Sequence, residues 1–176
     1  MCPDSEGTLR LSASSRMDAP KSRHNRAIAM ERYFDDFKPG ERFRSKGVTL
    51  TEAEIINFAL AYDPQPFHLD VGAAADSSFG GLIASGIQTF ALAWRMFLGE
   101  GLFSACGMGS PGIDELRWTA PVKPGDTIYT EAEVLEVRPS SSKPDRGTLR
   151  MGYRIVNQRG ETVLTMTILH ILKKRS

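Results

Sequence analysis

One segment, residues 87–98, restricts the possible folds of this chain more than any other. It has the length of a helix, and its side chains are apolar nearly all the way round: Ile87, Phe90, Ala91, Leu92, Ala93, Trp94, Met96, Phe97 and Leu98. A helix without a polar face is buried on most of its sides. We therefore expect another layer of the protein to wrap around it.

The second half of the chain supplies that layer. Four segments have the pattern of β-strands, at residues 113–120, 127–138, 147–158 and 162–173. The second of them alternates apolar and polar residues, which is typical of a half-buried strand. Turn residues separate the segments, and short connections between consecutive strands favour an antiparallel sheet. The predicted fold is α+β, an antiparallel sheet curled around one buried helix.

The length, charge and cysteine content of the chain indicate which classes of protein it resembles. The chain has 176 residues, which suits one domain, and its net charge of +1 gives no sign of a nucleic-acid or membrane partner. No apolar run is long enough to span a bilayer. Cys2 and Cys106 lack the spacing of metal ligands. We therefore expect no metal or other cofactor, and a reducing, cytoplasmic location.

The N-terminal segment differs from the rest of the chain. Residues 1–29 are rich in Ser, Arg and Lys and contain few large apolar residues. Such a segment buries too little surface to offset the entropy of ordering it, and it lacks the apolar core of a signal peptide. We expect a disordered extension over residues 1–29, followed by one folded domain over residues 30–176.

A strand and a helix precede the apolar segment. We expect the first strand at residues 43–50. Thr51-Glu-Ala-Glu54 is a capping box that begins a helix. That helix ends at Pro64, because the residue before a proline disfavours the helical conformation. A further short helix is expected at residues 69–77.

Two ionisable residues lie where that helix ends. Asp63 and His68 are separated by Pro-Gln-Pro-Phe, and the two prolines fix φ angles and stiffen the loop. A rigid spacing suits an acid–base pair, because histidine titrates near neutral pH and a carboxylate can orient it. Taken alone, such a pair more often caps a turn and packs than takes part in catalysis.

Three glycines lead into the apolar helix, at Gly80, Gly81 and Gly86. The first N–H groups of a helix have no partners within it and lie at the positive end of its dipole. A glycine at this point lets a ligand oxygen approach the backbone closely. The loop is therefore compatible with an oxyanion hole, and equally with tight turns alone.

Together these motifs resemble a known family. Asp63-Pro-Gln-Pro-Phe-His68-Leu-Asp70, then Phe79-Gly-Gly-Leu-Ile-Ala-Ser-Gly86, then Trp118-x-x-Pro121-Val with Gly125-Asp126, is similar to the signature of the MaoC-like dehydratases and (R)-specific enoyl-CoA hydratases. The resemblance covers residues 34–173. It implies the hotdog fold, a sheet wrapped around a long helix, and a homodimer or a larger hotdog assembly.

The resemblance also implies a mechanism. Asp63 and His68 would form a catalytic dyad that activates water for addition to C3 of a trans-2-enoyl thioester, and one of them would return a proton to C2. The N–H of Gly86 would donate to the thioester carbonyl, and the product would be the (R)-3-hydroxyacyl thioester. The carrier, coenzyme A or an acyl-carrier protein, stays open. Contacts with the acyl-CoA substrate are implied for Gln65, Pro66, Gly81, Ser85 and Trp94.

The sequence departs from the family pattern at three of these positions. Gln65 stands where the family often has asparagine, and Ser85 where it often has histidine. Trp94 stands where some hydratases have an assisting serine. Its indole either shortens the acyl pocket or belongs to the core.

Two other functions stay open. A hotdog thioesterase generally carries a carboxylate on the central helix, and residues 87–98 contain none. A non-catalytic acyl-CoA-binding subunit would be expected to lose the dyad, which is present. We assign Trp118 to core or dimer packing rather than ligand stacking, and His170 to a position in the last strand with no role in the chemistry. The basic residues 173–175 are assigned to a solvated tail, with phosphate binding the lesser alternative.

Overall fold

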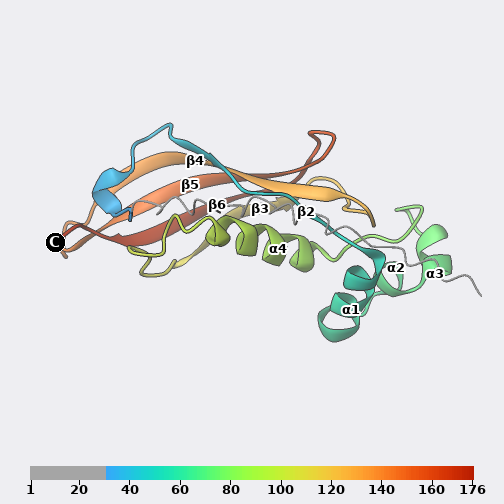
Figure 1. The fold of residues 1–176 in the computed structure, drawn as a ribbon. Coiled ribbons are helices and arrows are strands. Elements are labelled where there is room, and N and C mark those ends of the chain that lie inside the picture. The colour runs from blue at the N-terminus through green and yellow to red at the C-terminus, as the bar shows by residue number, and fades with distance from the viewer. Residues whose placement is uncertain (1–30) are drawn as a thin grey trace, which may run out of the picture.

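The computed structural model describes residues 31–176. The extension predicted at residues 1–29 lies outside the described residues. One long helix, α4 (Gly86–Gly99), lies along one face of a six-stranded antiparallel sheet (Figure 1). The strands are β1 (Arg42–Arg44), β2 (Val48–Thr49), β3 (Gly112–Trp118), β4 (Thr127–Pro139), β5 (Arg146–Asn157) and β6 (Thr162–Lys173). Their order is β1-β4-β5-β6-β3, and β2 also pairs with β4. This is the hotdog arrangement, so the predicted α+β hotdog fold is confirmed.

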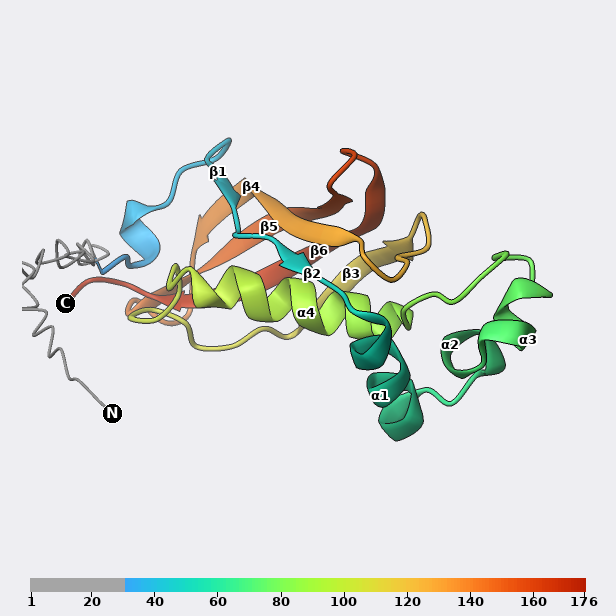
Figure 2. The same cartoon turned by 45° about the vertical axis from the view of Figure 1, so that its right-hand side comes forward.

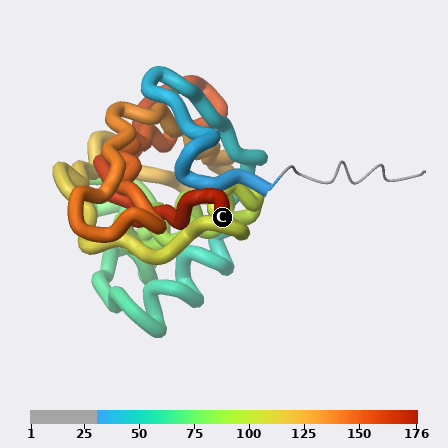
Figure 3. Tube along the Cα trace, turned by 90° about the vertical axis from the view of Figure 1, so that its left-hand side faces the viewer, coloured from blue at the N-terminus to red at the C-terminus, as the bar shows by residue number. Residues whose placement is uncertain are grey.

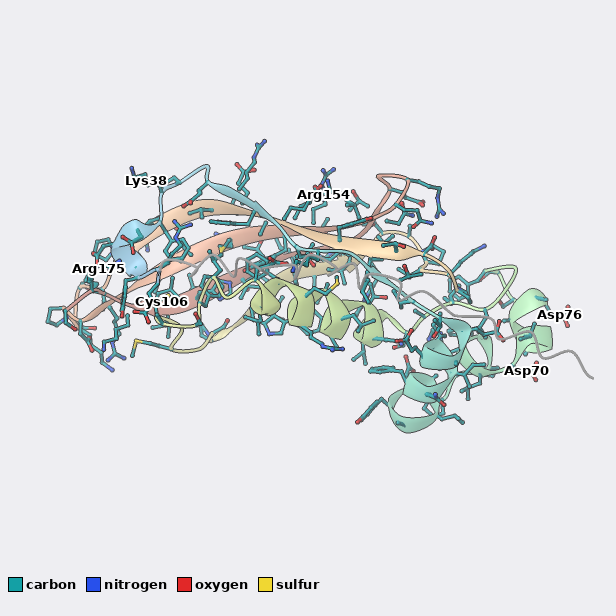
Figure 4. All side chains as sticks on the ribbon, in the orientation of Figure 1. Lys38, Asp70, Asp76, Cys106, Arg154 and Arg175 are labelled. Carbon is teal, nitrogen blue, oxygen red and sulfur yellow. The ribbon has the colours of Figure 1, made fainter. Side chains whose placement is uncertain are left out.

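The alternation of side chains in β4 explains how the sheet and the helix meet. Ile128, Thr130, Ala132 and Val134 are buried toward α4, while the residues between them are partly exposed on the other face. The Thr130 hydroxyl donates to the Ala93 carbonyl at 3.0 Å, which ties β4 to the middle of the helix. On the outer face, Arg154 of β5, which is labelled in Figure 4, pairs with Glu131 of β4 at 2.6 Å.

The central helix is less enclosed than its apolar composition predicts. Its buried side chains are Gln88, Thr89, Ala93 and Phe97. Ile87 and Leu98 are 53% and 43% exposed. The expectation that most sides of this helix are buried is therefore wrong for the isolated chain, because the sheet covers only one side of α4.

The first expected strand is split into β1 and β2. Both pair with β4, but Ser45 interrupts them: its N–H donates to the Thr130 carbonyl, and its hydroxyl accepts the Thr130 N–H. This side-chain bond replaces a rung of the ladder and bends the strand, as a bulge does.

The expected helix at residues 69–77 is also divided. α2 (Pro66–Leu69) ends at Asp70, whose carboxylate accepts the N–H groups of Gly72 and Ala73 and thereby begins α3 (Val71–Ala75). An aspartate in this capping position starts a new helix and does not continue the old one.

The helices α1 (Glu52–Tyr62), α2 and α3 project beyond one end of the sheet (Figures 1 and 2). At the other end, the C-terminal segment lies beside the 3₁₀ helix Phe34–Asp36 (Figure 3), and Arg175 pairs with Asp36 at 2.7 Å. One residue of the predicted solvated basic tail is therefore held by the domain itself. No helix within residues 31–176 combines the length and the apolar character needed to cross a membrane.

Candidate active site

The exit of α1 sets the position of Asp63. The predicted capping box is present, with the Thr51 hydroxyl accepting the Glu54 N–H and the Glu54 carboxylate accepting the Thr51 N–H. Asp63 is the C-cap residue of α1, and its N–H donates to the Ala59 carbonyl. A tight turn follows, because the Gln65 N–H donates back to the Asp63 carbonyl at 2.7 Å.

Helix α2 brings the histidine back to that aspartate. Pro66 occupies its first turn, where a missing N–H costs nothing. His68 lies two residues further on, and its Nε2 is 3.4 Å from Asp63 Oδ2. The structure therefore places the two predicted dyad residues side by side.

The imidazole of His68 is fixed in one orientation. Its side chain is buried, and its Nδ1 lies 2.8 Å from the Ile83 carbonyl oxygen. Since a carbonyl oxygen only accepts hydrogen bonds, Nδ1 carries a proton. In the neutral ring Nε2 is then unprotonated, and it is the nitrogen that faces Asp63.

Both oxygens of the Asp63 carboxylate have donors. Oδ2 accepts the Ser85 hydroxyl at 2.6 Å, and Oδ1 accepts the Gln65 amide at 2.8 Å. The Ser85 hydrogen bond, followed by the Gln65 bond, holds the pKa of Asp63 below its ordinary value against the opposing effect of burial. A carboxylate that accepts hydrogen bonds in its charged form stays ionised.

The N-terminus of α4 lies beside this pair. Ser85 is its N-cap and Gly86 its first residue. Among residues 31–176 no acceptor contacts the Gly86 N–H. A Cβ atom at Gly86 would overlap the indole of Trp118, so only glycine permits this close approach. The free N–H at the positive end of the helix dipole is suited to an oxygen that gains negative charge.

A pocket of about 540 Å³ joins these groups. Its walls are mainly apolar, and within the described part of the chain Asp63 and His68 are its only titratable lining residues. Trp118 lines the pocket while remaining 55% exposed, although the sequence assigned it to packing. The signal that pointed to it is its place at the head of the Trp118-x-x-Pro121-Val motif, since Pro121 and Val122 line the same pocket.

The remaining predicted substrate contacts are distributed differently. Gln65 lines the pocket, and Ser85 lies behind Asp63. Pro66, Gly81 and Trp94 are not among the residues that line it.

Trp94 belongs to an aromatic cluster between α4 and the sheet. Its indole stacks on the His170 ring with 5.7 Å between centroids and 3° between planes. His170 in turn lies 2.8 Å from the Tyr153 hydroxyl, and burial lowers the pKa of His170 to about 4. His170 thus lies in β6 as expected, buried and outside the candidate site, and Trp94 packs against the core of the domain. The cluster borders a separate pocket of about 330 Å³ toward the C-terminal end of α4.

No group of three or more His, Cys, Asp or Glu side chains within residues 31–176 is arranged to hold a metal ion. Cys106 is buried, and burial raises the pKa of its thiol. A buried, protonated thiol is a poor nucleophile. The ionisable groups available for chemistry in the pocket are therefore the carboxylate and the imidazole.

A family model described as the MaoC like domain matches residues 36–152 of the chain. A solved MaoC-like dehydratase from Rhodospirillum rubrum is 38% identical, with a TM-score of 0.78 over 83% of this chain and 99% of that one. The R-hydratase PhaJ1 from Pseudomonas aeruginosa is 28% identical, with a TM-score of 0.65 over 81% of this chain and 86% of that one.

A β-methylmalyl-CoA dehydratase from Chloroflexus aurantiacus is 30% identical over 85% of this chain. The alignment covers 42% of that protein, so the chain spans less than half the length of this relative.

Proposed function

We propose that this chain, which belongs to the MaoC-like dehydratase family, catalyses the reversible addition of water to a 2-enoyl thioester. One observation carries the proposal: a carboxylate–imidazole pair and an unpaired helix N–H open into the same apolar pocket. Water is a poor nucleophile that needs a base, and conjugate addition places negative charge on the thioester oxygen. The pocket offers a group for each requirement.

In the proposed reaction, Asp63 and His68 hold the water and take one of its protons as its oxygen bonds to C3. The electrons of the C2–C3 double bond move onto the thioester oxygen, which accepts the Gly86 N–H. The same proton is then delivered to C2, which leaves a 3-hydroxyacyl thioester and regenerates the dyad. Dehydration is the reverse sequence through the same groups.

The relatives support the class of reaction and of substrate. Two of the similar proteins are described as a dehydratase and an R-hydratase, and a third as a dehydratase of a coenzyme A thioester. We therefore propose acyl-CoA substrates and (R)-3-hydroxyacyl products for this chain. We also propose a part in fatty acid metabolism, and a cytoplasmic location based on the cysteine content of the sequence. The thioesterase alternative is weaker, because α4 carries no Asp or Glu from Gly86 to Gly99.

We also propose that the chain acts as a homodimer. β3 is an edge strand whose partner within the chain is β6. Apolar side chains are exposed on β3 and at the start of α4, namely Ile113 at 40%, Trp118 and Ile87. An unpaired strand edge next to exposed apolar side chains favours pairing with a second copy.

The test is the loss of enoyl-thioester absorbance with crotonyl-CoA and with longer and branched 2-enoyl-CoAs. We expect turnover by the wild type and a loss of about 10²–10⁴-fold in His68→Ala, the usual cost of removing a general base. Asp76→Asn is the matched control, because Asp76 is an exposed carboxylate on the same projecting segment (Figure 4). Absence of wild-type turnover with every substrate would contradict the proposal and favour a binding subunit.

A further inference from the structure

Within residues 31–176, Ser85 supplies the one hydroxyl that bonds to the dyad carboxylate. Its side chain is fully buried between the C-terminal end of α1 and the start of α4. Its Oγ accepts the Ile87 N–H at 3.2 Å and lies 2.6 Å from Asp63 Oδ2. Because Ile87 supplies a donor, the single hydroxyl proton of Ser85 is free to point only at the carboxylate. The N-cap of α4 therefore fixes the direction of this hydrogen bond.

We propose that Ser85 is a positioning residue, which couples the N-terminus of α4 to Asp63 and holds that carboxylate ionised and aimed at His68. The inference rests on the proposed hydration reaction, since it assigns a part to a residue that lies outside the pocket wall. It replaces the substrate contact that the sequence predicted for Ser85. The hydroxyl acts on the reaction through Asp63 only.

The hydrogen bonds to Asp63 give the two dyad residues different roles. Asp63 has donors on both oxygens, from Gln65 on Oδ1 and from Ser85 on Oδ2. A proton on Asp63 Oδ2 would compete with the Ser85 hydroxyl proton, which already points at that oxygen. The neutral acid of Asp63 is therefore disfavoured. The proton taken from water is therefore stored on His68 Nε2. Asp63 stabilises the imidazolium across the 3.4 Å gap until the proton passes to C2.

The expected effect of pH follows from the same contacts. Among the residues that line the pocket, His68 is the one titratable group that faces Asp63. Removal of the Ser85 hydroxyl takes away the largest contribution that lowers the pKa of Asp63. The carboxylate then protonates at a higher pH, so Ser85→Ala should lose more activity at low pH than at high pH.

The experiment compares wild type, Ser85→Ala and Ser85→Thr in crotonyl-CoA hydration across pH 4–9. We expect kcat to fall about 10-fold in Ser85→Ala, the scale of one hydrogen bond to a charged group. We expect KM to change little, and the loss of kcat to be larger at the acid end of the pH range than at the alkaline end. Ser85→Thr keeps the hydroxyl and should restore the wild-type profile. Ser104→Ala is the matched control at the far end of α4, where the Ser104 hydroxyl donates to the Gly101 carbonyl.

A second measurement separates this inference from the proposed reaction. The ¹³C shift of the Asp63 carboxyl is titrated by NMR in wild type and Ser85→Ala, with Asp63→Asn used to assign the signal. A higher pKa in Ser85→Ala supports the coupling even if no enoyl-CoA is turned over, an outcome that would defeat the proposed reaction alone. An unchanged Asp63 titration, or a Ser85→Ala variant that loses activity equally at every pH, would overturn the inference.

Discussion

Replacement of Gly86 by alanine tests the role of the α4 N-terminus. A Cβ atom at this position would overlap the Trp118 indole, so the added methyl group must displace that ring. Trp118 is 55% exposed, and its indole has no hydrogen bond within residues 31–176. It can therefore swing outward at little cost to folding. Alanine is also a better helix former than glycine, by about 0.5–1 kcal/mol in a helix interior.

The same methyl group should obstruct the reaction. It stands beside the N–H that would receive the thioester oxygen, and it displaces an indole that lines the same pocket. Loss of one oxyanion donor costs about 10²-fold or more in kcat, which corresponds to about 2.7 kcal/mol in the barrier. We expect Gly86→Ala to lose kcat on this scale while its melting temperature stays within a few degrees of the wild type.

Crotonyl-CoA hydration and thermal unfolding, measured on the same preparations, give the two numbers. The double variant Gly86→Ala/Trp118→Ala serves as the control, because it removes the overlapping ring. Activity that stays low in the double variant assigns the loss to the blocked N–H, and recovered activity assigns it to the displaced indole. A folded Gly86→Ala variant with wild-type kcat would refute the placement of the thioester oxygen at this N–H.

Three further predictions concern the fold and its assembly. Thr130→Val should lower the free energy of unfolding by about 1 kcal/mol in urea titrations, because it removes the buried hydroxyl that donates to the Ala93 carbonyl. An unchanged urea midpoint would contradict a role for that hydrogen bond. Burial raises the pKa of Asp126, but hydrogen bonds from the Lys123 N–H, Gln158 and Arg159 outweigh it and lower the pKa below its ordinary value of 3.8. The stability that the ionised Asp126 contributes is therefore present above about pH 4 and is lost as the pH falls through the folded-state pKa. Asp126→Asn should lower the free energy of unfolding at pH 7 and match the wild type near pH 2. An equal deficit at both pH values would refute the charge argument. Ile113→Arg places a charge on the exposed β3 edge and should convert a dimer to a monomer in sedimentation velocity, while a dimer that persists would place the interface elsewhere.

Local pattern was sufficient to predict much of the fold. The alternation in residues 127–138 and the capping box at Thr51 are short-range signals, and the structure has a strand and a helix start at those places. The burial of α4 was over-estimated, because the apolar composition of residues 87–98 does not say how many sides of the helix the sheet will cover. The break at Ser45 depends on a partner 85 positions away, which no local pattern contains.

In the candidate site, too, the features that lie close together in sequence were predicted and those that join distant residues were not. Asp63 and His68 lie within a few residues of chain, so a short motif that includes the later Gly86 was enough for the family resemblance to indicate them. The link from Ser85 to Asp63 spans 22 positions and depends on how α4 meets α1, and the sequence therefore assigned Ser85 to the substrate. Trp118 reaches the pocket from β3 only once the sheet has formed. Trp94 was placed by its offset from Gly86, but the side to which it points is set by the aromatic cluster around His170.

The most direct test of the central claim is a comparison of Asp63→Asn with the wild type in two assays of the same protein. Asparagine keeps the shape of the side chain but removes the charge beside His68 Nε2. Hydration of crotonyl-CoA should fall by about 10²–10⁴-fold. The Kd for a saturated acyl-CoA, measured by calorimetry, should stay within about twofold, because the pocket walls are unchanged. Wild-type turnover by Asp63→Asn would contradict the account of the dyad.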